Sequence, residues 1–299
     1  MKRILCLLAL SWGFATAAAQ TATTEALPFL RFQRDPATLG MAGAGSSMTD
    51  GSRDGVALLV NPAARLFSAS RLAVNASYAS WFPKAGAASS FQGGVSVKLA
   101  KGLALTAGAA YQKDAEAFAD YTPNALVAGG AVSVAPSASF ALGVAVKYGT
   151  MHYTQDMSLS GVAIDVMAQI HRSSWNLAAG VQSLGSKVKS STGEYALPTS
   201  LKAAADYTLD LSAVSLTAAA DADYFLKGSL AVSAGLQARL YEYFVLRTGY
   251  RYATPGGVLP SMFSLGGGAE YAGVALNLSY VLMDAHIAGT LMAGLSYSF

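Results

Sequence analysis

The chain has 299 residues, of which 53% are hydrophobic and 12% are charged, and its mean hydropathy is +0.37. Soluble domains carry about 25% charged residues, so this composition argues against an ordinary soluble domain. The chain has 20 basic and 17 acidic residues. Without the two basic residues at its start, 18 basic residues remain, so the charges nearly balance. That near balance argues against a nucleic-acid partner.

The first 20 residues have the composition of a secretory signal peptide. Two basic residues precede the apolar stretch Ile4–Phe14, and Ala17–Ala19 supply the small residues of a cleavage site. The single cysteine, Cys6, lies inside this segment. We therefore expect residues 1–20 to be removed and the mature chain to contain no disulfide.

Residues 21–70 do not alternate between apolar and polar positions. They contain a glycine- and alanine-rich run at Gly40–Gly45, a polar stretch at Thr49–Asp54 and the tripeptide Asn61-Pro62-Ala63. We expect this segment to be an irregular or partly helical plug rather than a set of lipid-facing strands.

From residue 71 to residue 299, apolar residues recur at every second position, which is the period of a β-strand with one apolar face. No uninterrupted apolar run after the signal peptide reaches the ~18 residues that a membrane helix needs. Roughly fourteen strands can be counted, an even number within the range of bacterial barrels. Because only helices and closed barrels satisfy every backbone group in lipid, residues 71–299 are predicted to form an all-β, antiparallel transmembrane barrel.

The connections between the predicted strands favour the same topology. Those after even-numbered strands are short, such as Lys101-Gly102 and Pro136-Ser137, whereas most of those after odd-numbered strands are longer, such as residues 112–123 and 184–197. Bacterial barrels have short periplasmic turns and longer outer loops. The parity of the loops therefore predicts which end of the barrel faces the outside.

Aromatic residues are predicted to form a girdle at each membrane interface. The predicted outer girdle consists of Trp81, Phe82, Tyr111, Tyr148, Tyr153, Tyr250 and Tyr252. The predicted inner girdle consists of Tyr207, Tyr241, Tyr243, Tyr271, Tyr297 and Phe299. The alternating last segment ends on an aromatic residue, so we expect Tyr297 and Phe299 to act as an assembly signal and this strand to close the barrel against the first.

Several short motifs resemble the FadL-like superfamily of outer-membrane barrels. Phe29-Leu30-Arg31-Phe32, Gly40–Gly45 and Asn61-Pro62-Ala63 are similar to its N-terminal signature, most of all in the branch that contains the PorV and PorQ proteins of the type IX secretion system. Gln182–Gly185 followed by Leu197–Lys202 resembles a mid-barrel motif of that branch. The resemblance implies a fourteen-stranded barrel with the N-terminal segment folded into the lumen.

Two functions are implied by this resemblance. The first is a PorV/PorQ-like, non-enzymatic accessory role in protein secretion or surface attachment of cargo, with secretion-system components or secreted cargo as partners. The alternative is a FadL-type passive transporter of hydrophobic small molecules across the outer membrane. Transport would need an apolar lumen pocket and an interrupted strand, for which Gly266–Gly268 is the candidate.

Both hypotheses imply the outer membrane of a Gram-negative bacterium, with membrane lipid and the barrel assembly machinery as partners. The chain departs from the family in its modest outer loops and in having Ala64-Arg65 where Gly-Leu is usual. These departures argue against a large cargo-binding surface made of long loops.

The plug offers six candidate site residues, which either anchor the segment inside the barrel or act as a hinge lining a ligand path. They are Gly40, Gly43, Gly45, Asn61, Pro62 and Ala63. The glycines lack the following Lys-Ser/Thr of a phosphate loop. Close packing against the barrel wall is therefore the expected role of the glycine run.

Charged residues are predicted by strand parity to point into the lumen, where they form either a network that holds the plug or a selectivity device. The predicted network consists of Asp206, Asp221, Asp223, Arg239, Arg247, Arg251 and Glu270, with Lys98, Lys147, Asp165 and Lys202 also inward. The three histidines lack metal-ligand spacing. We expect no catalytic residue, no metal site and no cofactor, and hence a protein that is not an enzyme.

Overall fold

The computed structural model describes residues 25–32, 35–81, 88–100, 102–114, 122–153, 157–190, 193–282 and 289–299. The predicted signal peptide and Phe82 lie outside these ranges. Among the described residues, no helix is both long enough and apolar enough to cross a membrane.

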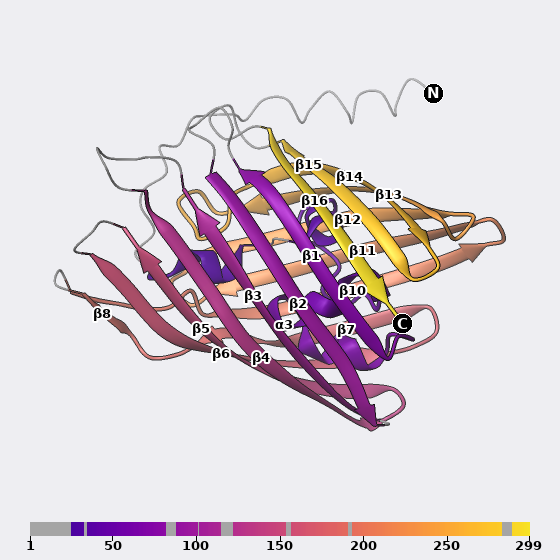
Figure 1. The fold of residues 1–299 in the computed structure, drawn as a ribbon, viewed down its shortest axis with the longest axis horizontal. Coiled ribbons are helices and arrows are strands. Elements are labelled where there is room, and N and C mark those ends of the chain that lie inside the picture. Colours follow the sequence, from indigo (N-terminus) through magenta and orange to yellow (C-terminus); the bar gives the residue numbers. More distant parts are fainter. Residues whose placement is uncertain are drawn as a thin grey trace.

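Fourteen antiparallel strands form a closed barrel (Figure 1). They are β1 (Leu72–Trp81), β2 (Ala88–Ala100), β3 (Leu103–Lys113), β4 (Asn124–Ser137), β5 (Phe140–His152), β6 (Ser158–His171), β7 (Trp175–Leu184), β10 (Ser200–Leu211), β11 (Val214–Phe225), β12 (Leu230–Leu240), β13 (Phe244–Ala253), β14 (Met262–Tyr271), β15 (Val274–Leu282) and β16 (Thr290–Ser298). Two further strands, β8 (Val188–Ser190) and β9 (Gly193–Tyr195), form a hairpin between β7 and β10. The predicted fold class is confirmed.

The barrel closes by pairing the last strand with the first. Val74 of β1 lies opposite Tyr297 of β16, and the register continues without a shift along the pair. The N–H groups of Arg71 and Leu72 both donate to the Phe299 carbonyl, at 2.5 and 2.8 Å. No edge strand is left at this seam, which removes the template for aggregation that an open edge would present.

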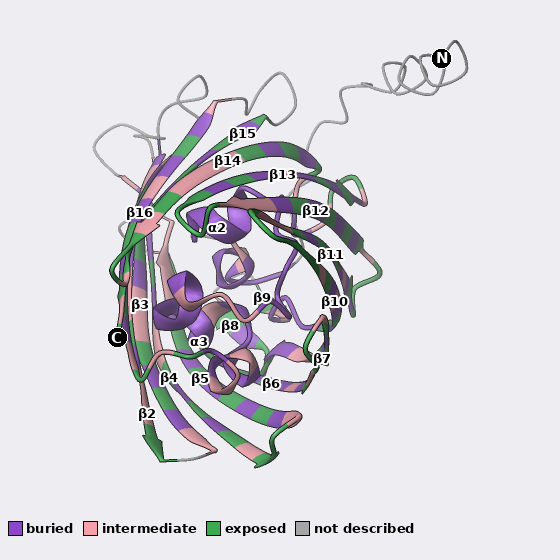
Figure 2. Ribbon diagram, turned by 90° about the vertical axis from the view of Figure 1, so that its right-hand side faces the viewer, coloured by how far each residue is buried: buried purple, intermediate pink, exposed green. Residues whose placement is uncertain are grey.

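Each barrel strand has one apolar face and one small or polar face, as the alternation predicts. Large apolar side chains such as Val144 and Leu278 are exposed on the outside, whereas polar side chains such as Gln169 and Ser264 are buried inside. Figure 2 shows exposed and buried residues alternating along the strands. An outward apolar face and an inward polar face are what a lipid-facing barrel requires. The short connections gather at one end, called here the inner end, and the longer ones at the opposite, outer end.

The plug, residues 25–32 and 35–70, lies inside the barrel (Figures 1 and 2). It is built from short helical turns: η1 (Pro28–Arg31), α2 (Pro36–Leu39), η2 (Gly51–Val56), α3 (Ala57–Val60) and η3 (Pro62–Leu66). Pro begins three of these turns, where its missing N–H costs nothing. Asp35, Asp50 and Asn61 accept N-cap hydrogen bonds from backbone N–H groups.

Glycines in the wall let the plug backbone approach closely. An added Cβ on Gly249 would overlap the backbone of Met41, and one on Gly40 would lie 3.1 Å from the Gly266 Cα atom. Close backbone approach is a common reason for glycine within a strand. The glycine run of the plug and the glycines of β13 and β14 are therefore complementary surfaces.

Two expectations about the wall are wrong. Gly266–Gly268 do not interrupt β14, which pairs with β13 and β15 without a register shift. Of these three glycines, Gly266 lies against the plug, next to Gly40. Trp81 does not belong to the outer girdle but faces the lumen, since it has the opposite parity to the outward Val74 and Tyr78. Its indole N–H donates to the Ser90 hydroxyl at 2.7 Å.

The glycine fit between plug and wall predicts a substitution effect. Gly249→Val should destabilise the folded protein by about 1–3 kcal/mol, the usual cost of overpacking, because the new side chain would overlap Met41. Gly267→Val is the matched control, since the nearest atom to its Cβ is the Val245 carbonyl oxygen at 3.8 Å. Thermal unfolding in detergent measures both, and equal unfolding temperatures would contradict the proposed fit.

Candidate functional site

Apolar side chains line part of the lumen at its outer end. Three clusters of buried apolar side chains lie at the outer ends of the strands, and together they are called the outer apolar layer. The first joins plug residues 27–30 to β3, β4, β6 and β8, the second joins Leu39 to β1, β2 and β14–β16, and the third lies between β11, β12 and β13. Phe32 packs against the first and third clusters, and its ring centroid lies 6.4 Å from that of Trp81 in the second.

The hydrogen-bonded wall is incomplete beside the outer apolar layer. β7 ends at Leu184, which lies opposite Ile164 of β6. The outer part of β6, residues 158–163, pairs with β5 on one side. On its other side, no barrel strand pairs with it within the described residues. The β8–β9 hairpin and the following residues cover this stretch, with Val188 and Leu197 packed near Gly161. We call this stretch the β6–β10 gap.

A buried ion pair fixes the backbone where β7 departs from the wall. The register between β6 and β7 shifts between Ile164 and Val166, and Ser183 adopts a left-handed φ of 55°. The Ser183 N–H donates to Asp165 Oδ1 at 2.7 Å, and Lys147 Nζ lies 2.6 Å from Asp165 Oδ2. The Lys147 and Asp165 side chains are 1% and 0% exposed. Other register shifts, in β2–β3 and β4–β5, lie at inner turns.

A buried charged network lies beneath the outer apolar layer and joins the plug to β10 and β11. Arg31 of the plug pairs with Asp223, with 2.5 Å between Nη2 and Oδ1. The Nη1 of Arg31 also donates to Gln182 Oε1. Lys202 Nζ lies 3.0 Å from a carboxylate oxygen of Asp223 and of Asp221. Asp221 accepts in addition from the Gly45 N–H at 2.7 Å. Each carboxylate is thus paired, as burial of charge requires.

The other predicted lumen charges divide between plug contacts and wall contacts. Asp206 accepts from the Ser47 hydroxyl at 2.5 Å, and Arg247 and Arg239 lie 3.5 and 3.4 Å from Asp50 of the plug. Glu270 pairs with Arg239 at 2.7 Å. Arg251 instead donates to the Pro260 carbonyl at 2.9 Å.

Parity places the aspartates of β10 and β11 inside but names no partner for them. In the structure their partners are Arg31, Lys202 and plug backbone or hydroxyl groups. The parity of a strand position predicts which face its side chain occupies, but it does not predict which plug residue lies next to it inside the barrel.

The tripeptide Asn61-Pro62-Ala63 lies against the wall near the inner end. The Asn61 amide donates to the Ser46 carbonyl at 3.0 Å and to Gln169 Oε1 at 2.7 Å, while its oxygen accepts from the Ala63 N–H. The Pro62 carbonyl accepts from the Ser133 hydroxyl at 2.7 Å. The Gly43 and Gly45 backbones have φ of 90° and 92°, which lets the chain turn after α2.

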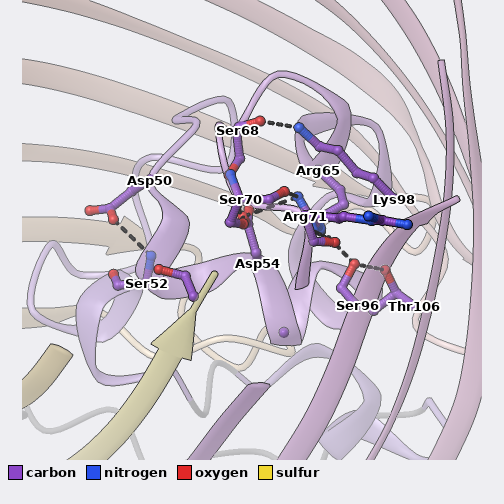
Figure 3. Close-up of polar contacts among 12 residues, drawn as sticks. Asp50, Ser52, Asp54, Arg65, Ser68, Ser70, Arg71, Ser96, Lys98 and Thr106 are labelled. Atoms are coloured by element: carbon purple, nitrogen blue, oxygen red, sulfur yellow. Dashed lines mark hydrogen bonds and ion pairs between the residues drawn. The ribbon is translucent and has the colours of Figure 1, made fainter. Parts of the chain in front are cut away.

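An arginine that sequence reasoning did not single out as a site residue anchors the inner end of the plug. Arg65 is 0% exposed, and its three guanidinium nitrogens donate to Ser96 Oγ at 2.7 Å and to the carbonyls of Ser70 and Arg71 at 2.9 and 3.0 Å. It also lies 3.3 Å from Asp54 Oδ2 (Figure 3). The sequence did carry one sign of this role: Arg65 follows Asn61-Pro62-Ala63 at a position where the resembled family usually has an apolar residue.

Nearby groups complete this inner anchor (Figure 3). Asp54 accepts from the hydroxyls of Ser70, at 2.7 Å, and Ser68. Lys98 of β2 donates to the Ser68 carbonyl. The inner anchor therefore ties the plug to β2 and to Ser70 and Arg71, which lead into β1.

The two plug aspartates respond differently to burial. Burial alone would raise the pKa of Asp50, but three guanidinium groups and the Ser52 N–H lower it to about 2. Those groups belong to Arg239, Arg247 and Arg53. Burial raises the pKa of Asp54 to about 6, because Arg65 and two serine hydroxyls offset only part of the desolvation.

Within the part of the chain that the structure describes, no group of three or more His, Cys, Asp or Glu residues could hold a metal ion. His171 stacks on Phe67, with ring centroids 4.8 Å apart, and pairs with Asn176. That arrangement accounts for His171 as a packing residue.

No protein-family model and no curated protein sequence matches this chain. Solved structures do. The chain is similar to the CymD monoaromatic hydrocarbon channel, with a TM-score of 0.65 and 12% identity over 89% of this chain and 97% of that one. It is similar to the Pseudomonas putida toluene transporter TodX, with a TM-score of 0.62 and 12% identity over 90% and 99% of the two chains.

A Pseudomonas aeruginosa FadL homologue also matches, with a TM-score of 0.53 and 12% identity over 89% of this chain and 98% of that one. At such identities the likeness establishes the fold. The first two neighbours are named as a channel and a transporter, in agreement with the expectation of a non-enzymatic protein. The chain has the fold of FadL-type outer-membrane hydrocarbon channels.

The inner anchor predicts a stability effect. Arg65→Met should cost about 3–5 kcal/mol, the usual result of leaving one partner of a buried pair uncompensated, and adding Asp54→Asn should recover part of that loss. Lys189→Met is the control, since the Lys189 side chain is 84% exposed. Thermal unfolding compares the variants, and an unchanged unfolding temperature for Arg65→Met would contradict the assigned role.

The pKa of Asp54 predicts a pH dependence. Since the folded-state pKa of about 6 lies above the ordinary value of 3.8, protonation of Asp54 favours the folded plug. This stabilisation is fully present below the ordinary pKa and is lost as the pH rises through the folded-state value. The unfolding temperature should therefore fall across that range, and Asp54→Asn should flatten the fall. An identical pH profile in Asp54→Asn would rule out this assignment.

Proposed function

We propose that the protein is a FadL-type passive transporter of hydrophobic small molecules across the outer membrane. The observation that carries the proposal is that the outer apolar layer lies directly behind the β6–β10 gap. Leu27, Leu159 and Ala163 belong to that layer, and Val188 and Leu197 of the covering segment pack against the same side chains. An apolar molecule entering from the outer end would meet an apolar environment beside a break in the wall.

The charged network beneath supports a sideways route rather than a straight one. Arg31, Lys202 and Asp223 are paired and buried between the apolar layer and the inner half of the plug. Passage of an apolar molecule through this level would break charge pairs without replacing them, at a high desolvation cost. Movement between β6 and the β8–β9 hairpin would leave these pairs intact and deliver the molecule into the bilayer.

The substrate class is inferred from the lining and from the neighbours. Apolar and aromatic side chains such as Phe29, Phe32 and Trp81 face the outer half of the lumen. The similar solved structures are named as a monoaromatic hydrocarbon channel and a toluene transporter. We therefore assign small, uncharged hydrocarbons as the substrate class to be tested first.

A PorV/PorQ-like role in secretion or surface attachment of cargo is the alternative. Its support is the similarity of Phe29–Phe32, Gly40–Gly45 and Asn61–Ala63 to that branch. These motifs lie mainly in the buried plug, so they favour a shared plug conformation more than a surface for cargo. Cargo release therefore serves as the second readout below.

A removable tether across the gap tests the transport proposal. The double variant Gly161→Cys/Val188→Cys joins β6 to the hairpin, since an added Cβ on Gly161 lies 3.0 Å from Val188 Cγ2 and disulfides require closely spaced Cβ atoms. The single natural cysteine, Cys6, lies in the predicted signal peptide. The matched control is Lys189→Cys/Glu194→Cys, which staples the two strands of the hairpin to each other without joining the wall.

Uptake of radiolabelled toluene by cells producing each variant should fall when the first tether is oxidised and recover on reduction, while the control tether leaves uptake unchanged. Unchanged uptake with the gap tethered would contradict the sideways route. A deletion strain with normal toluene uptake and impaired release of surface cargo would instead favour the secretion role.

A further inference from the structure

A groove outside the barrel belongs neither to the lumen nor to the gap. A cavity of about 520 Å³ lies over β6, β7, β10 and β11. Its floor is made of alanines, most of them on the exposed outer face: Ala168, Ala179, Ala203, Ala205, Ala220 and Ala222. Ile170 and Leu177 border it near the inner end.

The strand register explains the shape of this groove. Ala168, Ala179, Ala203 and Ala222 lie opposite one another in a single row across four strands, and Ala205 faces Ala220 in the next row. The row toward the outer end carries Val181, Leu201 and Tyr224, and the row below Ala205 carries Trp175 and Tyr207. Small side chains between bulky rows leave a trough.

The length of the trough suits a hydrocarbon chain. It extends to Val232 of β12 and therefore crosses five strands, a span of about 19 Å at a strand spacing of about 4.8 Å. One leaflet of a bilayer has a hydrocarbon thickness of about 15 Å, half of about 30 Å. A lipid acyl chain lying obliquely on the wall would fit along it.

The inner end of the trough carries a basic and aromatic group. Arg172, in the exposed turn before β7, lies with its guanidinium carbon 5.9 Å from the Trp175 ring centroid. Trp175 is two residues from Leu177 on the same face, about 7 Å along the strand. No carboxylate among the described residues forms an ion pair with Arg172. Arg172 Nη1 donates to the His171 carbonyl at 3.0 Å. A guanidinium without a carboxylate partner, beside an interfacial tryptophan, matches the chemistry of a lipid phosphate.

We propose that this groove binds one phospholipid of the inner leaflet, with an acyl chain on the alanine floor and its phosphate at Arg172. Charge complementarity at one end and an apolar trough at the other favour a lipid over a second copy of the chain, whose outward face is apolar throughout the membrane-spanning region. The site is independent of the transport proposal, because it lies outside the wall and below the β6–β10 gap.

Retained phospholipid tests the site. The full-length protein is purified in mild detergent, exposed to phosphatidylglycerol as the probe and examined by native mass spectrometry. Ala203→Leu/Ala220→Leu fills the floor, and Arg172→Gln removes the phosphate partner. The matched controls are Ala218→Leu, an exposed alanine of β11 outside the groove, and Lys189→Gln, an exposed cation at the outer end.

The wild type and both controls should retain a single phospholipid, and each groove variant should bind it about tenfold more weakly, as expected for loss of a charge-assisted hydrogen bond or of matched apolar contact. Unfolding temperatures in detergent verify that every variant is folded. Equal retention in groove variants and controls would overturn the proposal. A lipid-free wild-type dimer that Ala203→Leu/Ala220→Leu converts to monomers would also overturn it, and would assign the groove to a second copy.

Discussion

Mutual burial of charged side chains from the plug and the barrel wall is the constraint on which the rest of the structure depends. A charge inside a lumen filled by protein must be paired, because the loss of hydration is large. Arg31 with Asp223 and Arg65 with Asp54 meet this requirement at two levels of the barrel. The first pair joins the plug to β11, whereas Arg65 and Asp54 both belong to the plug, and Arg65 reaches the wall through the Ser96 hydroxyl of β2. These contacts also hold the plug in one position.

This arrangement gives the lumen two environments with different chemistry. The outer apolar layer lies at the outer end, and the charged network and inner anchor lie below it. The hydrogen-bonded wall is interrupted beside the outer apolar layer, where Asp165 holds the left-handed backbone of Ser183. A molecule suited to the outer apolar layer is thus unsuited to the charged network beneath it, which is the physical basis for proposing a sideways path.

Much of the fold follows from the sequence, because alternation at every second residue predicts the two faces of each strand and places Asp221 and Arg247 inside. The features that the sequence did not predict depend on contacts between residues far apart in the chain. The interruption of the wall depends on Ser183 and its contact with Asp165, which no local pattern shows, whereas Gly266 of β14 makes room for Gly40 of the plug. Arg65 sits in a helical turn whose burial becomes evident only when the plug is seated against Ser96.

The central claim is that an apolar molecule occupies the outer apolar layer beside the β6–β10 gap. A crystal structure of the protein soaked with bromobenzene tests it most directly, since the anomalous signal of bromine locates the ligand. The account predicts a bromine peak among Leu27, Phe32 and Leu159, on the lumen side of Ser158–Ala163. A peak confined to the charged level around Arg31 and Asp223, or no peak within the barrel, would contradict it.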